Sequence, residues 1–229
     1  MPLAFGTYFI AFAMLIGCGP GSRDDLDYSY GVLQTIEDED LQGAPLSQFE
    51  SVEWGITRSE QLRRMIVDDG IAQGRKVLEI ETETGLIALL CLQQGATKVV
   101  ASDTNPAAIA NAKYNAARME MELNFEVVDA SKNRSNPFAG VDPKKKFDLI
   151  LVDFRGRNSP EDVAVAFIDE LPNRLTPGGR CIATCGRKPV LTRLLERASE
   201  TELQTNILHD AAREDLPEEH PEGVLIEVR

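Results

Sequence analysis

The chain has 229 residues, of which 43% are hydrophobic and 27% charged, so it is long enough to bury the core of one sizeable domain with an appendage. Its formal net charge of −13 at pH 7 disfavours a nucleic-acid partner, because such binding requires Lys and Arg side chains to displace counterions from phosphates. The same charge disfavours docking of the folded domain on anionic lipid.

The chain begins with an apolar run. Residues 3–17 contain no charged side chain and have about the length of a signal-peptide core, too short for a comfortable membrane span. The run leads into Cys18, and the segment resembles a bacterial lipoprotein signal, except that no Lys or Arg precedes it. The resemblance implies a signal peptide over 1–17, lipidation of Cys18, and a protein anchored on the periplasmic or extracytoplasmic side of the cell membrane. A wrongly assigned start codon would instead imply a cytoplasmic protein.

An acidic segment punctuated by Pro and Gly follows over residues 18–54. Its composition predicts a tether or a loosely packed arm, with Tyr28, Tyr30 and Val32 as candidates for docking on the rest of the chain. The domain itself is predicted to span residues 55–229, where a helix begins at Ser59.

From Lys76 onward, strands and helices alternate. The predicted strands cover residues 76–80, 98–102, 125–128, 147–152 and 181–185, and the predicted helices cover 86–94, 106–121, 162–175 and 191–198. Two further strand-like segments, 205–208 and 224–227, have no helix between them and predict a hairpin that makes the final strand antiparallel. The fold class is therefore α/β, with a mostly parallel sheet that is covered by helices on both faces. Cys91, Cys181 and Cys185 are interpreted as buried small hydrophobic residues.

Acidic residues follow four of the predicted strands. Glu79, Asp103, Asp129 and Asp153 all lie at or just beyond carboxyl strand ends, which is the edge where open α/β sheets bind ligands. The alternative is that strand ends are polar simply because loops are polar. Four acids in corresponding positions favour a binding site on this edge.

Three segments carry a resemblance to a known family: Glu79–Gly85, Ser102–Ala116 (SDTNPAAIANAKYNA) and Leu171–Thr184 (LPNRLTPGGRCIAT). Their order and spacing resemble class I S-adenosylmethionine-dependent methyltransferases, and the second segment is similar to ribosomal-protein and release-factor methyltransferases. The resemblance implies a seven-stranded, Rossmann-like fold over about residues 55–229. It also implies S-adenosylmethionine as the cofactor and an unknown substrate, either a small molecule or a protein.

The resemblance further implies a role for individual residues. Glu79 would bind the methionine end of the cofactor and Gly85 would be the last glycine of the binding turn. The remaining implied contacts are those of Asp103 with the ribose, Thr104 and Asn105 with the adenosine, Asp129 and Ala130 with the adenine amine, and Asp153 with the substrate.

Two residues of the binding turn depart from the family pattern. Glu81 and Glu83 stand where the family has glycines, which allow the cofactor to approach the backbone closely. Each glutamate would place a negative charge beside the carboxylate of the cofactor. Two like charges about 4 Å apart repel by roughly 4 kcal/mol at an effective dielectric near 20. A left-handed backbone at these positions would add a further cost. We therefore expect Glu81 and Glu83 to weaken or abolish cofactor binding.

The substrate side also departs from the pattern. The segment Asp153-Phe154-Arg155-Gly156-Arg157 lacks the two prolines that follow the fourth strand in enzymes acting on amide or base nitrogens. Asp153 remains a candidate base or orienting group. Arg155 and Arg157 are interpreted as solvated loop charges, with pairing to an acidic substrate or partner as the alternative.

Three hypotheses follow. The first is an active methyltransferase, since methyl transfer from a sulfonium needs alignment more than acid–base chemistry. The second is a methyltransferase fold that has lost catalysis and acts as a membrane-tethered binding module. The third, a different nucleotide enzyme such as one dependent on NAD, is the weakest because the dinucleotide glycine pattern is absent. Export away from cytoplasmic S-adenosylmethionine, together with the glutamates, favours lost catalysis.

Overall fold

The computed structural model describes residues 28–54, 59–155, 161–208 and 219–229. The predicted signal peptide, Cys18 and Arg157 lie outside the described residues. Among the described helices, none has the length and apolar character needed to cross a bilayer.

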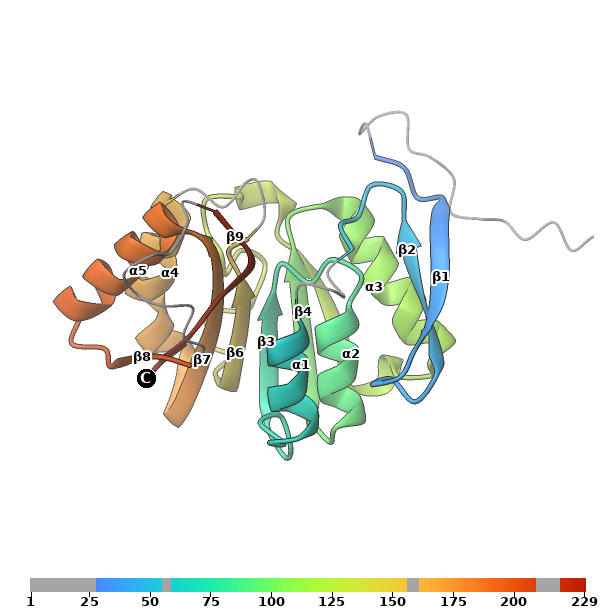
Figure 1. The fold of residues 1–229 in the computed structure, drawn as a ribbon, viewed down its shortest axis with the longest axis horizontal. Helices are drawn as coiled ribbons and strands as arrows, with labels where there is room; N and C mark the ends of the chain where they lie inside the picture. Colours follow the sequence, from blue (N-terminus) through green and yellow to red (C-terminus); the bar gives the residue numbers. More distant parts are fainter. Residues whose placement is uncertain (1–27, 55–58, 156–160, 209–218) are drawn as a thin grey trace, which may run out of the picture.

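A seven-stranded sheet forms the centre of the molecule (Figure 1). Its spatial order is β5-β4-β3-β6-β7-β9-β8, with β9 antiparallel to both of its neighbours and the other pairs parallel. This confirms the Rossmann-like, mostly parallel sheet and its C-terminal antiparallel hairpin. The strands are β3 Lys76–Ile80, β4 Lys98–Asp103, β5 Phe125–Asp129, β6 Phe147–Asp153, β7 Leu175–Arg187, β8 Thr205–Ile207 and β9 Glu219–Val228.

Helices cover both faces of the sheet because successive strand residues point to opposite sides. In β6, Leu149 and Leu151 pack with the residues of α1 and α2, whereas Ile150 and Val152 pack with those of α4 and α5. All four side chains are almost completely buried, as expected of a parallel sheet with two covered faces. The helices are α1 Glu60–Val67, α2 Leu86–Gln93, α3 Pro106–Arg118, α4 Glu161–Arg174 and α5 Lys188–Glu200.

Several element ends differ from the sequence prediction. α3 stops at Arg118 instead of Met121, because Glu120 adopts a left-handed backbone and the Met121 amide turns back to the Ala116 carbonyl. β7 begins at Leu175, ahead of the strand predicted over residues 181–185, and a register shift against β6 accommodates the additional residues, Gly178 among them. Ser59 immediately precedes α1, but its side chain makes no capping hydrogen bond.

The structure also describes most of the predicted tether. Strands β1 Val32–Asp38 and β2 Ala44–Phe49 form an antiparallel hairpin that lies beside α3 (Figure 1). Tyr30 and Phe49 are buried with the first turn of α3, whereas Val32 is 42% exposed. Residues 28–54 are therefore packed on the domain and do not form a loose arm, because their apolar side chains fill the space beside α3.

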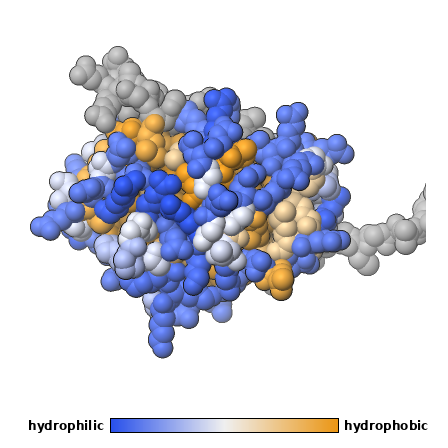
Figure 2. All heavy atoms as spheres, turned by 90° about the horizontal axis from the view of Figure 1, so that it is seen from below, coloured by the Kyte–Doolittle hydropathy of each residue, from blue (hydrophilic) through white to orange (hydrophobic). Residues whose placement is uncertain are grey.

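The two edges of the sheet differ in charge. At the amino ends of the strands, five lysines border a hollow, and Glu126 pairs with two of them, at 3.3 Å to Lys98 and 2.7 Å to Lys145. Figure 2 shows this side of the molecule, where hydrophilic side chains cover most of the surface. The acidic residues singled out by the sequence lie at the opposite edge, at the carboxyl ends of the strands. The lysines are Lys76, Lys98, Lys144, Lys145 and Lys146.

Candidate functional site

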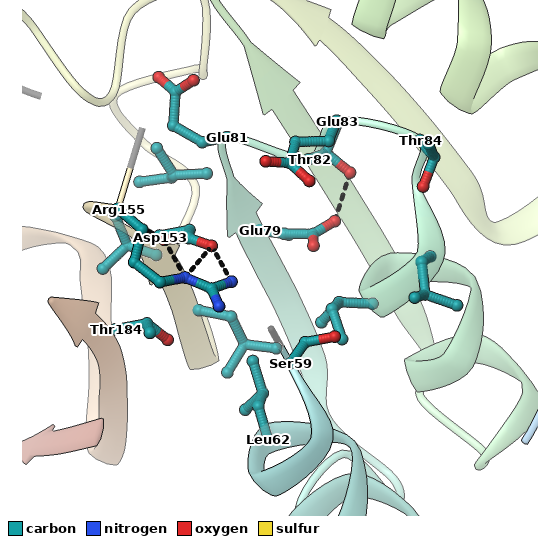
Figure 3. Close-up of a pocket in the computed structure, with 15 residues that line it drawn as sticks. Ser59, Leu62, Glu79, Glu81, Thr82, Glu83, Thr84, Asp153, Arg155 and Thr184 are labelled. Carbon is teal, nitrogen blue, oxygen red and sulfur yellow. Dashed lines mark hydrogen bonds and ion pairs between the residues drawn. The ribbon is translucent and has the colours of Figure 1, made fainter. Parts of the chain in front are cut away.

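A pocket lies between the carboxyl ends of β3 and β6, on either side of the point where the strand order reverses (Figure 3). This is the position at which open α/β sheets bind ligands. The cavity has a volume of about 40 Å³, which is room for a few water molecules. Its lining residues are Ser59, Leu62, Glu79, Ile80, Glu81, Thr82, Glu83, Thr84, Leu86, Ile87, Leu151, Val152, Asp153, Arg155 and Thr184.

The turn between β3 and α2 has a left-handed backbone at three alternate positions. The φ angles are 63° at Glu81, 52° at Glu83 and 84° at Gly85. Only Gly85 is free of the cost that a side chain brings in this region, which is about 1–2 kcal/mol for other residues. The turn has therefore kept a glycine-type conformation at two positions where glutamate replaces glycine.

Gly85 is required for a second reason. A Cβ atom at this position would lie 3.0 Å from the Cβ of Ala112 in α3, closer than nearly all real contacts of this kind. The glycine thus permits α3 to pack directly against the turn. Backbone conformation and packing thus both require glycine at the end of this turn.

Glu79 lies at the base of the pocket and is 6% exposed. It accepts a hydrogen bond from the Thr82 hydroxyl, which the dashed line in Figure 3 marks. Burial raises the pKa of the Glu79 carboxyl well above its ordinary value, and the nearby charges of Glu83 and Asp103 act in the same direction.

Glu81 and Glu83 are both among the residues that line the pocket, and the Glu81 carboxylate points away from Glu79 and Asp153 (Figure 3). The pKa of each carboxyl is raised to about 8, chiefly by burial and additionally by the nearby carboxylates of Asp103 and Asp153. The two side chains are therefore mostly uncharged near pH 7. The predicted charge repulsion with a cofactor carboxylate must be corrected accordingly, since it develops fully only above about pH 8. The volume of the side chains and the backbone cost remain at every pH.

Asp103 anchors the turn to the end of β4. Its Oδ2 accepts the Glu83 amide at 2.9 Å and its Oδ1 accepts the Asn105 amide at 2.8 Å. The side chain is 3% exposed, and burial raises its pKa to about 6 although these amide hydrogen bonds oppose the shift. A carboxylate offers about four lone-pair sites, more than these backbone amides use, so Asp103 keeps acceptor capacity for a ribose hydroxyl.

The other predicted adenosine-side residues lie outside the pocket lining. Asn105 caps α3 by accepting the Ala107 amide at 2.9 Å, and it donates to the Ser51 carbonyl at 2.7 Å, so its amide group serves the fold. Thr104, next to it, is half-buried.

Asp129 ends β5 directly beside Asp103 in the strand register, as expected of two neighbouring strand ends. It is exposed, and its pKa is lowered by hydrogen bonds from Ser131. Ala130 is buried and donates its amide to the Asp103 carbonyl at 2.9 Å.

On the substrate side, Asp153 and Arg155 form an ion pair (Figure 3). The Arg155 Nε lies 2.9 Å from both carboxylate oxygens, and its Nη2 also bonds Asp153 Oδ2. The Arg155 side chain is only 9% exposed, so its interpretation as a solvated loop charge is wrong. It packs over Gly186, where an added Cβ would lie 2.8 Å from the Arg155 Cγ.

The sequence reasoning missed several pocket residues. Thr82 and Thr84 are buried and line the pocket. They alternate with the two glutamates in the sequence, and this alternation could have identified them as pocket residues. Leu62 comes from α1 and Thr184 from β7, and nothing in their local sequence marks them. Only the packing of α1 and β7 around the strand ends brings them to the site.

Comparison with known proteins agrees with this geometry. Residues 77–179 match the family model described as a methyltransferase domain. A candidate protein N5-glutamine methyltransferase of Methanocaldococcus jannaschii is 33% identical over 117 residues, which are 47% of this chain and 59% of that protein. The ribosomal protein L11 methyltransferase of Symbiobacterium thermophilum is 26% identical over 135 residues, which are 58% of this chain and 40% of that protein. The chain thus spans about half the length of these relatives.

Solved structures show the same fold. A ribosomal protein L11 methylase from Lactobacillus delbrueckii subsp. bulgaricus superposes with a TM-score of 0.56 at 20% identity, covering 75% of this chain and 77% of that one. A methyltransferase structure complexed with SAH gives a TM-score of 0.57 at 14% identity, covering 81% and 53%. The protein described here is therefore methyltransferase-like, in sequence over residues 77–179 and in fold throughout its seven-stranded sheet.

Proposed function

We propose that this protein is a class I S-adenosylmethionine-dependent methyltransferase-like protein in which cofactor binding is weakened or lost. The family match and the sheet topology support the cofactor class. The weakening rests on one observation: Glu81 and Glu83 stand at two positions where the family pattern has glycine, both line the pocket, and both have a left-handed backbone.

The remaining residues partly fit the cofactor. Glu79 offers a carboxyl for the cofactor's ammonium, and Asp103 offers acceptor capacity for its ribose. The cavity, of about 40 Å³, is small for a methionyl group, so the residues that line it, Glu81 and Glu83 among them, would have to move on binding. Such movement costs binding free energy, because the glutamate side chains must be reordered before the ligand can enter.

The bound cofactor would supply an activated methyl group. This chain would supply alignment, with Asp153 held in one orientation by the Arg155 guanidinium. The relatives are named for protein substrates, but the absence of the two prolines after β6 weakens the case for an amide nitrogen here. The substrate remains either a small molecule or a protein. The negative net charge of the chain disfavours a nucleic-acid partner.

A catalytically inactive binding module is the second candidate. The small volume of the pocket, with Glu81 and Glu83 in its lining, favours it. In this version Cys18 carries a lipid that holds the domain at the extracytoplasmic side of the membrane, which is the only membrane contact we propose. Labelling of cells with a lipid precursor should mark the wild type and leave Cys18→Ser unmarked. An unmarked wild type would exclude the anchor and would favour a cytoplasmic protein.

Calorimetric titration tests the proposed function. Residues 19–229 are titrated with S-adenosylmethionine and with its demethylated product, beside a Glu81→Gly/Glu83→Gly double variant. We expect weak or undetectable binding by the wild type and at least tenfold tighter binding by the variant. Micromolar binding by the wild type, unchanged in the variant, would show that the glutamates are accommodated and would refute the weakening.

A further inference from the structure

Two buried asparagines of α3 hold the N-terminal hairpin. Asn111 and Asn115 lie one helical turn apart and are both 0% exposed. Asn111 accepts the Phe49 amide at 2.8 Å and donates to the Ser47 carbonyl at 2.8 Å. Asn115 accepts the Ser47 amide at 2.9 Å and donates to the same carbonyl at 2.8 Å. The two asparagine side chains thus hydrogen-bond backbone amides and a carbonyl of β2, as the backbone of a third strand would.

Asn115 makes one further contact, which Asn111 lacks. Its Nδ2 also donates to the carbonyl of Thr84, at 2.9 Å, in the turn that lines the pocket. The side chain therefore uses both of its N–H groups on backbone carbonyls and its oxygen on a backbone amide. A single buried amide group joins β2 to the strained turn.

The contact lies where the turn most needs support. Thr84 stands between Glu83 and Gly85, which both have a left-handed backbone. Ala112, on the same helix, packs closely against Gly85. The turn is thus held from α3 at two adjacent residues, by a hydrogen bond and by close packing.

We propose that Asn115 is a positioning residue that makes the β1–β2 hairpin a structural part of the cofactor turn. The functional unit of this protein then includes the β1–β2 hairpin, within the segment that composition marks as an acidic arm. The consequence for binding rests on the proposed function, whereas the effect on the turn itself does not.

Asn115→Asp and Asn111→Asp form a matched pair for the test, because the substitution keeps shape and acceptor but removes the amide donors. Hydrogen exchange is followed in the full-length protein at the amides of Glu83 and Gly85, which are bonded to Asp103 and to the Thr82 carbonyl. We expect exchange at these two amides to be at least tenfold faster in Asn115→Asp and to change less than twofold in Asn111→Asp. Equal acceleration in both variants, or none in Asn115→Asp, would overturn the proposal.

Affinity is the second readout. In the wild type, or in the Glu81→Gly/Glu83→Gly protein if only that variant binds, Asn115→Asp should raise the Kd for the demethylated cofactor at least tenfold. Asn111→Asp should raise it less than threefold. Because the exchange measurement needs no ligand, absence of binding in every protein would refute the proposed function alone. If Asn115→Asp fails to fold, Asn115→Gln replaces it, since Gln keeps the donors but moves them away from Thr84.

Discussion

Acidic side chains at the two sides of the pocket are buried in different ways. On the β6 side, Asp153 faces the guanidinium of Arg155, which bonds both of its oxygens. On the β3 side, Glu81 and Glu83 are buried close to other carboxylates, and their pKa values rise to about 8. The two sides differ in their partners: a guanidinium faces Asp153, whereas burial and neighbouring carboxylates favour the protonated form of Glu81 and Glu83. The β3 side of the pocket therefore has a charge that depends on pH.

The largest effect is expected from removing the cation on the β6 side. Arg155→Ala should lower the free energy of unfolding by about 3 kcal/mol, because it leaves the half-buried Asp153 without its partner and empties the space over Gly186. Arg197→Ala, which removes an exposed ion pair with Asp169 on the protein surface, is the control and should change stability little. Urea unfolding of both variants measures the difference. Equal stability of the two variants would mean that the Asp153–Arg155 pair is not effectively buried.

A smaller effect is expected from pH on the β3 side. The folded-state pKa values of Glu81 and Glu83, about 8, lie above the unfolded value near 4.5, so the folded protein holds protons that the unfolded chain has released. Raising the pH from 5 to 8 should therefore lower the free energy of unfolding, by about 2 kcal/mol after discounting for partial exposure.

Denaturant titrations at several pH values measure this slope. The Glu81→Gln/Glu83→Gln protein should lose most of it, because an amide does not titrate. An unchanged slope in that protein would assign the pH dependence to other groups, such as Glu79 or Asp103.

The smallest effect is expected from restoring the glycine pattern. Glu81→Gly and Glu83→Gly should each raise the free energy of unfolding by about 1 kcal/mol, because glycine adopts the left-handed backbone without a side-chain penalty. Glu120→Gly, at a left-handed position that ends α3, should show a similar gain and serves as a control distant from the pocket. Thermal or chemical unfolding at about pH 4, where the turn glutamates are mostly protonated in both the folded and the unfolded state, separates this backbone term from the charge term.

The local sequence was sufficient for the order of the strands and helices and for the edge that carries the pocket. Hydrophobic patterns indicate how each segment packs. The acidic residues that follow the strands indicate which edge of the sheet carries the pocket. The glutamates in the turn were equally visible, whereas their left-handed backbone was only a condition at that stage and is given by the structure. These features depend on residues close together in the chain.

Tertiary structure alone decided the rest. The acidic composition of residues 28–54 gave no sign of the hairpin, because its docking depends on Asn111 and Asn115, more than sixty residues away. The local sequence indicated that Arg155 is solvated. Its burial depends on the space left by Gly186, which lies in another strand and is far from Arg155 in the sequence. The protonation of Glu81 and Glu83 likewise depends on carboxylates and on burial contributed by separate strands. Contacts between distant segments set burial, and burial sets the charge and the position of these side chains.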